Sequence, residues 1–350
     1  MIKTYTLKES EKWDEIVKSF SNHDVYYLSG YVRAFEINGD GQAMLIYHEN
    51  KDKNTRAINV VMKRDIGTFE PLKQYIKQGE LFDIVTPYGY GGFIVEGIDT
   101  QGLKNEYEQF CKESHIISEF VRFHPMLFNW KSVEDIYEII HLGHTVYMDT
   151  SSEEVIWQNL SSKNRNMIRK AQKEDLQVFW CRDPEVIKPF MEIYNATMDK
   201  DNASEYYYFD EEFYKSLLLD LKYNAMWFYS VKDRSIAAIS IFMFCNGQMH
   251  YHLSASRREY SKLAPTNLLL YEAAIWASKN GYKSLHMGGG VGSGEDSLYK
   301  FKKAFNRSDD VEFCIGKKIF DEEAYQKLVD IRIRENGFKR ESNYFPVYRI

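Results

Sequence analysis

A glycine-rich run and the lysine-rich segment after it are the residues best suited to chemistry. Residues 288–294 read Gly-Gly-Gly-Val-Gly-Ser-Gly, and residues 298–305 read Leu-Tyr-Lys-Phe-Lys-Lys-Ala-Phe. Glycines let a bound molecule approach the backbone closely, although this run matches neither G-x-x-x-x-G-K-[ST] nor G-x-G-x-x-G. Phe301 and Phe305 would fix one face of a helix in the core. Lys302, beside that face, could stabilise a developing oxyanion. The alternative is an ordinary amphipathic helix whose lysines extend into solvent.

A basic segment in the middle of the chain is a second candidate for chemistry. Residues 161–173 carry five basic side chains and no acidic one, in a chain of net charge −6. If a helix begins near Ser161, Lys163 lies in its first turn, where the backbone N–H groups already favour an anion. We therefore interpret Lys163 and Arg165 as candidates for phosphate binding. A solvated helix face is the alternative for such a run of charges.

Histidines offer a possible base but no metal site. His124 lies at the end of a predicted strand, within Phe120–Pro125. It could act as a general base, although a lone histidine is often only structural. His250 and His252 point to the same face of another predicted strand without a third ligand nearby, and the four cysteines are each more than 60 residues from the next. The sequence therefore predicts neither a metal site nor a disulfide framework.

The segments that must position these residues form an antiparallel meander, then a helix and one more strand. Asn246-Gly247 between two apolar runs is typical of a type I′ hairpin turn, and Pro265 suits a first helical turn. A weaker copy of the same order precedes residue 145. The predicted elements are strands 226–231, 235–244, 248–255 and 282–287 with a helix at 267–279, and, earlier, strands 43–48, 55–62, 83–86 and 117–123 with a helix at 102–114.

This repeated order predicts an α+β fold of two similar domains, 1–145 and 146–319, and the length of 350 residues fits two domains. The net charge of −6 argues against a surface devoted to nucleic acid, so DNA is not an expected partner. The charged N-terminus has no apolar signal region, and no window approaches the 18 apolar residues that a membrane span needs. We therefore expect a cytoplasmic protein without a transmembrane segment.

Three stretches make the chain resemble the Fem aminoacyltransferases of peptidoglycan bridge synthesis and their BioF2-like, GNAT-fold relatives. They are Ser162–Lys170, the tripeptide Leu263-Ala264-Pro265 ahead of a helix, and Gly288–Gly290 followed by Asp296–Phe305. The last stretch ends in Ser-Leu-Tyr-x-Phe-Lys-x-x-Phe and is the most specific. Gly30–Arg33 and Arg122–Pro125 add further matches, so the resemblance runs over most of the chain.

The resemblance implies two tandem GNAT-like domains, with the C-terminal segment 320–350 packed on the first. It also implies transfer of an acyl group, usually an aminoacyl group from charged tRNA. The acceptor would be an amine of a nucleotide- or lipid-linked peptide precursor of the cell wall.

The resemblance also suggests roles for single residues. By position, Lys302 resembles the lysine that stabilises the tetrahedral intermediate, and Arg33 resembles a basic residue that holds the acceptor's diphosphate. His124 stands where some members carry an acid, which weakens its case as a base. The motif residues that become candidates for substrate binding are Gly289, Gly290, Tyr299 and Phe301.

The expected donor is aminoacyl-tRNA rather than acyl-CoA. GNAT enzymes that use acetyl-CoA resemble one another in a Gly-rich pyrophosphate loop ahead of the central helix. Here residues 260–265 contain no glycine, and Pro265 lacks an N–H. The donor is a co-substrate, and no separate cofactor is expected. Two alternatives stay open: an acyl-CoA-dependent N-acyltransferase acting on an amino sugar of a surface polysaccharide, and a non-catalytic GNAT-like binding module.

Overall fold

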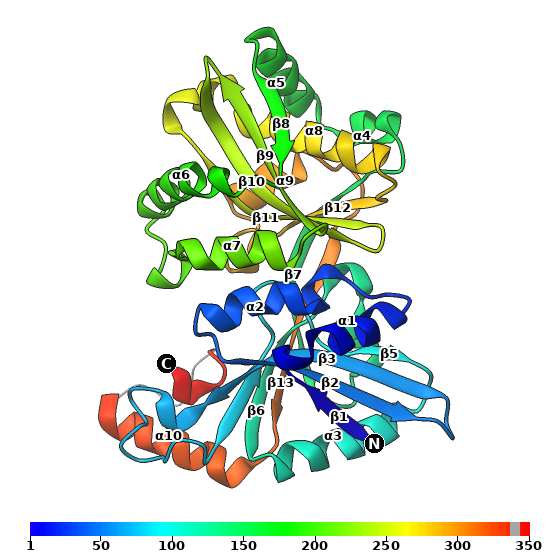
Figure 1. The fold of residues 1–350 in the computed structure, drawn as a ribbon, viewed down its shortest axis with the longest axis vertical. Helices are drawn as coiled ribbons and strands as arrows, with labels where there is room; N and C mark the ends of the chain where they lie inside the picture. Colours follow the sequence, from blue (N-terminus) through cyan, green and yellow to red (C-terminus); the bar gives the residue numbers. More distant parts are fainter. Residues whose placement is uncertain (337–343) are drawn as a thin grey trace. The chain divides into compact units, whose positions relative to one another are not determined.

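The computed structural model describes residues 1–336 and 344–350 and divides the chain into two compact units (Figure 1). Unit 1 contains Met1–Leu142 and Phe313–Ile350, and unit 2 contains Gly143–Glu312. The predicted boundary at residue 319 is therefore wrong, because residues 315–319 pair with an earlier strand of unit 1. Residues 143–145, which we expected in the first domain, belong to unit 2. The C-terminal segment 320–350 lies in unit 1, and its residues 337–343 fall outside the described part of the chain.

One mixed sheet forms the centre of unit 2. Its strands are β7 (Glu138–Asp149), β8 (Gln177–Cys181), β9 (Ala225–Lys232), β10 (Ser235–Cys245), β11 (Gln248–Ser256) and β12 (Ser284–Gly288), and their order in the sheet is β7-β12-β11-β10-β9-β8. Strands β9 to β11 form the predicted antiparallel meander. Helix α8 (Pro265–Lys279) crosses from β11 to β12, which pair in parallel. Asn246 and Gly247 both have positive φ, as a type I′ turn requires.

Helices cover both faces of the unit 2 sheet. Helices α4 (Glu153–Asn159), α5 (Ser162–Lys173), α8 and α9 (Ser297–Lys303) share one hydrophobic core with Phe228 of β9. Helices α6 (Ile187–Lys200) and α7 (Glu211–Asp220) lie on the opposite face, where Phe190 packs 4.7 Å from Trp227 between ring centroids. Trp227 and Phe228 are neighbours in β9, so their side chains must point to opposite faces.

Unit 1 repeats this arrangement with a different sequence. Its strands are β1 (Ile2–Tyr5), β2 (Gln42–Asn50), β3 (Thr55–Asp65), β4 (Phe82–Val85), β5 (Ile94–Glu96), β6 (Ile116–Arg122) and β13 (Val311–Ile319). The order is β1-β2-β3-β4-β6-β13, with β5 paired to β3. Helix α3 (Thr100–Glu113) precedes β6, which pairs in parallel with β4. The predicted α+β class is therefore confirmed.

The remaining helices of unit 1 are α1 (Ser10–Ser19), α2 (Ser29–Ile37) and α10 (Glu322–Asn336). Helix α3 buries Leu103 and Tyr107 in one core cluster, and α10 buries Leu328 in another with Ile66.

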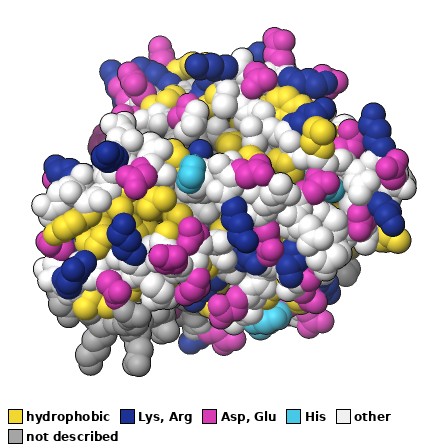
Figure 2. Space-filling view, turned by 90° about the horizontal axis from the view of Figure 1, so that it is seen from below, with side chains coloured by type: hydrophobic (Ala, Val, Ile, Leu, Met, Phe, Trp, Pro, Cys, Tyr) yellow, Lys and Arg dark blue, Asp and Glu magenta, His cyan; other side chains and the backbone are white. Residues whose placement is uncertain are grey.

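Acidic and basic side chains are intermixed over the face shown in Figure 2. Among the described residues, none of the helices is long and apolar enough to span a membrane.

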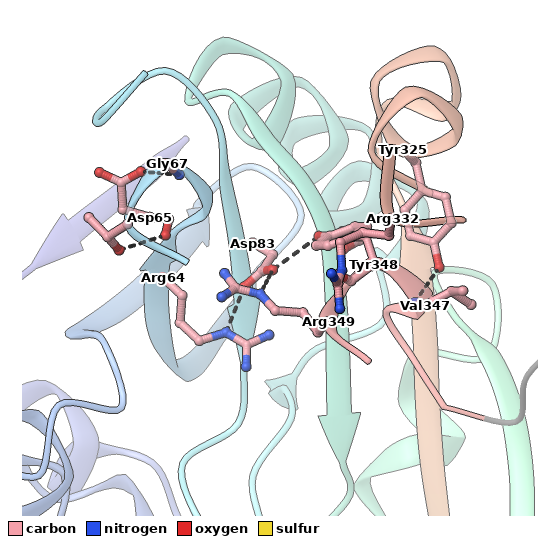
Figure 3. Close-up of polar contacts among 11 residues, drawn as sticks. Arg64, Asp65, Gly67, Asp83, Tyr325, Arg332, Val347, Tyr348 and Arg349 are labelled. Carbon is pink, nitrogen blue, oxygen red and sulfur yellow. Dashed lines mark hydrogen bonds and ion pairs between the residues drawn. The ribbon is translucent and has the colours of Figure 1, made fainter. Parts of the chain in front are cut away.

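The last residues of the chain are held in unit 1 by the buried carboxylate of Asp83 (Figure 3). Arg64 Nε donates to its Oδ1 at 2.6 Å, and Arg349 Nε donates to its Oδ2 at 2.8 Å. Tyr348 OH also donates to Oδ2, at 3.0 Å. Because Asp83 is fully buried, these partners must offset the free-energy cost of removing its carboxylate from water. One acid therefore ties strands β3 and β4 to residues 348–349.

Replacing Asp83 should destabilise the protein strongly. Asp83→Asn leaves two guanidinium groups without their buried carboxylate, and we expect the free energy of unfolding to fall by about 3–5 kcal/mol. Glu70→Gln is the control, because the Glu70–Lys73 ion pair is exposed and its loss should cost less than about 1 kcal/mol. Urea denaturation followed by tryptophan fluorescence measures both. Equal effects of the two substitutions would contradict the role given to Asp83.

A second buried acid of unit 1, Glu119 of β6, is surrounded by neutral hydrogen-bond donors. Its Oε2 accepts from the hydroxyls of Tyr107 and Tyr137 at 2.7 and 2.8 Å, and its Oε1 accepts from Asn59 Nδ2 at 2.9 Å. Burial raises the pKa of Glu119 to about 7, against the opposing effect of these hydrogen bonds. The carboxyl group is therefore neutral in the folded protein at mildly acidic pH, where the same group is ionised in an unfolded chain.

This difference predicts a pH dependence of stability. Because the pKa of Glu119 is higher in the folded state, its contribution is complete below the unfolded pKa and is lost as the pH rises through about 7. Between the unfolded pKa of 4.5 and a pH above 7, the free energy of unfolding should fall by up to about 3 kcal/mol on account of Glu119. Glu119→Gln stays neutral and should lack this part of the slope. Urea denaturation from pH 4.5 to 8 tests the prediction, and an unchanged slope in the variant would refute it.

Candidate active site

Strands β11 and β12 pair at their amino ends and part toward their carboxyl ends. The two strands pair only through Gln248–His250 and Ser284–His286. A bulge in β11 leaves His252 as an extra residue opposite β10. Diverging strand ends of this kind are where open α/β sheets bind ligands.

Burial, reinforced by the neighbouring His250, lowers the pKa of His252 to about 3, so this imidazole is neutral near pH 7.

Lys302 of α9 reaches the end of β12 from within unit 2. The residue is only 8% exposed, and its Nζ donates a hydrogen bond to the carbonyl O of Gly289 at 2.7 Å. Burial lowers the pKa of Lys302 to about 8, while the carboxylate of Asp296 acts in the opposite direction. A lysine ammonium has three N–H donors, so two are left for a ligand. A buried cation with directed donors is suited to stabilising an oxyanion.

Asp296 closes the glycine-rich loop onto α9. As the N-cap of this helix, it accepts a hydrogen bond from Tyr299 N through Oδ1 at 2.8 Å. Its Oδ2 accepts from Val291 N at 3.0 Å, on the loop side. This role of Asp296 was not predicted from the sequence. Its signal was an aspartate three residues before a helical N–H, which is the spacing of an N-cap.

Gly289 and Gly290 are both close to other parts of unit 2. A Cβ at Gly290 would overlap the carbonyl of Gly294 and the carboxylate of Asp296. A Cβ at Gly289 would lie 3.0 Å from the carbonyl O of His144. The two glycines therefore allow the close approach that brings the Gly289 carbonyl to Lys302.

The aromatic residues of the motif support α9. Tyr299 OH donates to Asp310, whose other oxygen accepts from Lys303 Nζ at 2.8 Å. Phe301 packs against the core cluster, and its ring lies 5.5 Å from that of Phe305. These contacts position the helix that carries the lysine. A contact of Tyr299 or Phe301 with substrate stays a prediction.

Helix α5 joins the site through a neutral amide, Asn164. Its Nδ2 donates to the carbonyl of Ala304, directly after α9, at 3.3 Å. Its Oδ1 accepts from Nδ2 of Asn267, in the first turn of α8, at 2.8 Å. One buried side chain thus holds the start of α8 against the end of α9. Asn164 and Asn267 were not predicted as site residues, because an asparagine within a basic or apolar run gives no signal of its own.

The two basic candidates of α5 differ in their surroundings. Lys163 is exposed in the first turn of the helix. Arg165 is half-buried, and its Nη1 donates to the carbonyls of Trp157 and Leu160 at 3.3 and 3.0 Å. Arg165 therefore satisfies the C-terminal carbonyls of α4, and phosphate binding by either residue stays a prediction. Arg169, Lys170 and Lys173 are also exposed, which gives α5 a basic surface.

The other two predicted residues, His124 and Arg33, belong to unit 1. His124 is fully buried, and its Nε2 lies 3.4 Å from Oδ1 of Asp24, which is also buried. The rings of Tyr26 and Tyr90 pack on the imidazole at 5.7 and 5.9 Å between centroids. Arg33 is half-buried on α2. Asp24 was missed, because 100 residues of sequence separate it from His124. Unit 2 thus brings together Lys302, Gly289 and Gly290, whereas His124 and Arg33 form part of unit 1.

Substitution of the close-packed glycine should open the loop. Gly290→Ala places a Cβ against Gly294 and Asp296, so we expect a loss of about 1–3 kcal/mol in the free energy of unfolding. Gly294→Ala is the matched control, since a Cβ there meets only the Val291 carbonyl at 3.9 Å; its effect should stay within about 0.5 kcal/mol. Urea denaturation of both variants tests this. A neutral Gly290→Ala would show that the loop is not packed as described.

Residues 159–303 match the family model described as an acetyltransferase (GNAT) domain. No curated protein matches the chain. Among solved structures, FemX is similar with a TM-score of 0.66 at 14% identity, over 93% of this chain and 99% of FemX.

Two further solved structures have the same fold. A conserved protein of unknown function from Bacteroides thetaiotaomicron matches with a TM-score of 0.57 at 13% identity, over 91% of this chain and 99% of that one. The C-terminal domain (DUF2156) of a proposed lysylphosphatidylglycerol synthetase from Agrobacterium fabrum matches with a TM-score of 0.54 at 12% identity, over 95% and 98% of the two chains.

At these identities the structural matches establish the shared fold, and they confirm the predicted resemblance to Fem-type tandem GNAT proteins. The matching domain also supports the predicted enzyme class, an acyltransferase. Residues 159–303 thus match an acetyltransferase (GNAT) domain, and the chain as a whole has the fold of FemX.

Proposed function

We propose that this protein transfers an aminoacyl group from aminoacyl-tRNA to an amine of a peptidoglycan precursor. The observation that carries the proposal is the buried ammonium group of Lys302, hydrogen-bonded to Gly289 at the carboxyl end of β12. By its position in the Ser-Leu-Tyr-x-Phe-Lys motif, this lysine resembles the Fem lysine that stabilises the tetrahedral intermediate.

The reaction needs few groups beyond this lysine. The acceptor amine attacks the ester carbonyl carbon, a C–N bond forms, and the carbonyl oxygen becomes an oxyanion. The two N–H donors of Lys302 that do not bind Gly289 can stabilise that oxyanion. Collapse breaks the ester C–O bond, and the proton lost by the amine neutralises the departing hydroxyl. A base with a pKa near ~6.5, or the substrate itself, suffices to accept that proton. We propose His124 for this role, beside the buried carboxylate of Asp24.

The surroundings of α8 support a large anionic donor. Helix α8 begins with Pro265, which has no N–H, after Ala264 in a left-handed conformation, and no side chain caps it. Few backbone donors are therefore offered to a pyrophosphate. The exposed basic side chains of α5 lie on the helix whose Asn164 contacts α8. We propose that Lys163 and Arg165 meet the phosphates of the donor, in the cytoplasm, where charged tRNA is found.

The acceptor is the second part of the proposal. The Fem resemblance suggests a nucleotide- or lipid-linked peptide, with Arg33 of α2 holding the diphosphate. One structural neighbour is described as a domain of a proposed lysylphosphatidylglycerol synthetase, a name that combines an amino acid with a phospholipid. An acceptor that carries a phosphate-linked anchor is common to both. We further propose Gly289, Gly290, Tyr299 and Phe301 as substrate contacts around Lys302.

The description of the matching family model favours a second candidate, an acetyltransferase. In that case acyl-CoA would be the donor, and an amino sugar of a surface polysaccharide the acceptor. The attack on a thioester would use Lys302 in the same way, and the leaving group would be a thiol instead of a hydroxyl. The two candidates therefore differ in the donor and not in the role of the lysine.

A transfer assay separates these candidates. Purified protein is incubated with mixed radiolabelled aminoacyl-tRNAs or with labelled acetyl-CoA, against UDP-linked muramyl peptides and UDP-amino sugars. We expect label to move from tRNA to the muramyl peptide. Lys302→Ala should lower the rate by about 10²–10³-fold, equivalent to about 2.7–4 kcal/mol of transition-state stabilisation. Lys300→Ala, an exposed lysine of the same helix, is the matched control and should retain the rate.

Each other outcome has a definite meaning. Label that moves only from acetyl-CoA would replace the first candidate by the second. Equal rates for Lys302→Ala and the wild type would refute the role of the lysine. Absence of transfer from either donor to any acceptor offered would count against both enzymatic candidates and favour a binding module.

A further inference from the structure

Asp296 connects the glycine-rich loop, helix α9 and the buried lysine. Its two carboxylate oxygens accept from Val291 N at 3.0 Å and from Tyr299 N at 2.8 Å. Val291 is two residues after Gly289, whose carbonyl accepts from Lys302 Nζ at 2.7 Å. The loop is therefore held at Val291 by Asp296 and at Gly289, two residues earlier, by Lys302. The negative charge of Asp296 also acts on the ammonium group.

We propose that Asp296 is a positioning residue for Lys302. It holds the loop so that the Gly289 carbonyl meets the ammonium group, and its negative charge keeps that buried group protonated. The carboxylate thus has two tasks, one geometric and one electrostatic. This inference rests on the proposed function of Lys302 in acyl transfer and adds a residue to which the family resemblance gave no role.

Other charged groups near Lys302 in unit 2 do not take this place. Asp310, after α9, is paired with Lys303 at 2.8 Å and accepts from Tyr299 OH. Helices α5 and α8 meet the end of α9 through the neutral amides of Asn164 and Asn267. Other titratable residues of the same segments are Glu295 and Lys300, both exposed, His144 of β7, whose carbonyl faces Gly289, and His286 of β12, bonded to Thr145.

Two substitutions test these tasks, and separate readouts distinguish the charge from the geometry. Asp296→Asn keeps the size of the side chain but removes the charge, and its single carbonyl oxygen can accept from only one of the two N–H groups. Asp296→Ser keeps an N-cap oxygen and loses both the charge and the bond to Val291. Glu295→Gln removes a charge of the same sign one residue away, from an exposed side chain, and serves as the matched control.

The first readout needs no substrate. Competitive trace acetylation of the lysines, quantified by mass spectrometry across pH 6–11, gives the pKa of Lys302 in each protein. We expect Asp296→Asn to lower it by about one unit relative to the wild type and Glu295→Gln to leave it unchanged. Asp296→Ser should give the same shift, so the test holds if the asparagine variant fails to fold.

The second readout is the pH profile of the transfer rate. Loss of the charge should move its basic limb to lower pH by the same amount as the pKa of Lys302. The deficit of Asp296→Asn should therefore grow about sixfold between pH 6.5 and 8.5, whereas a merely structural role gives a deficit that does not vary with pH. Amide hydrogen exchange at Val291 should accelerate most in Asp296→Ser.

The outcomes distinguish this inference from the function on which it rests. An unchanged lysine pKa in Asp296→Asn, in a wild-type protein that transfers acyl groups, overturns the inference alone. A wild-type protein without any transfer activity overturns the proposed function, and the labelling result then still decides whether Asp296 sets the charge of Lys302.

Discussion

The burial of one ammonium group, that of Lys302, is the constraint on which the rest of the candidate site depends. A shift of its pKa from 10.5 to about 8 means that the charged form is less stable than in water by about 3 kcal/mol. Such a charge needs fixed partners. The Gly289 carbonyl is one partner, and Asp296 supplies an opposing charge. A cation held in this way gains most when a negative charge forms beside it, as happens in the tetrahedral intermediate of acyl transfer.

The two units have similar strand arrangements, but their parallel strand pairs differ in how far the pairing continues. In unit 1 the chain after β4 continues the parallel pairing with β6, since Gly91 N donates to Arg122 O at 2.8 Å and Arg122 Nε donates to Gly89 O at 3.0 Å. In unit 2, by contrast, β11 and β12 are paired over three residues and then part. Residues 89 and 91 of unit 1 thus lie beside Arg122 at the end of β6. Lys302, the residue proposed to stabilise the oxyanion, belongs to the unit whose parallel strands part.

Features coded by neighbouring residues could be predicted from the sequence. The Asn246-Gly247 hairpin and helix α8 follow from turn and capping preferences, and the structure has both where they were expected. Features made by distant residues could not. Strand β13 pairs with β6 across more than 190 residues, so the second domain boundary was misplaced. Asn164, Asn267 and Asp24 act only through tertiary contacts. Lys302 was found because its motif is local, whereas its burial became visible only in the fold.

The most direct test of the account is how tightly the protein binds a mimic of the tetrahedral intermediate. The measurement is the affinity of a phosphonate analogue of the aminoacyl–amine adduct, relative to that of the matching unreactive amide, in wild type and in Lys302→Ala. The account predicts that the wild type binds the phosphonate at least about 10²-fold more tightly than the amide, and that Lys302→Ala loses most of this preference. An equal preference in both proteins would contradict it, because the buried lysine would then contribute nothing to the stabilisation of an oxyanion.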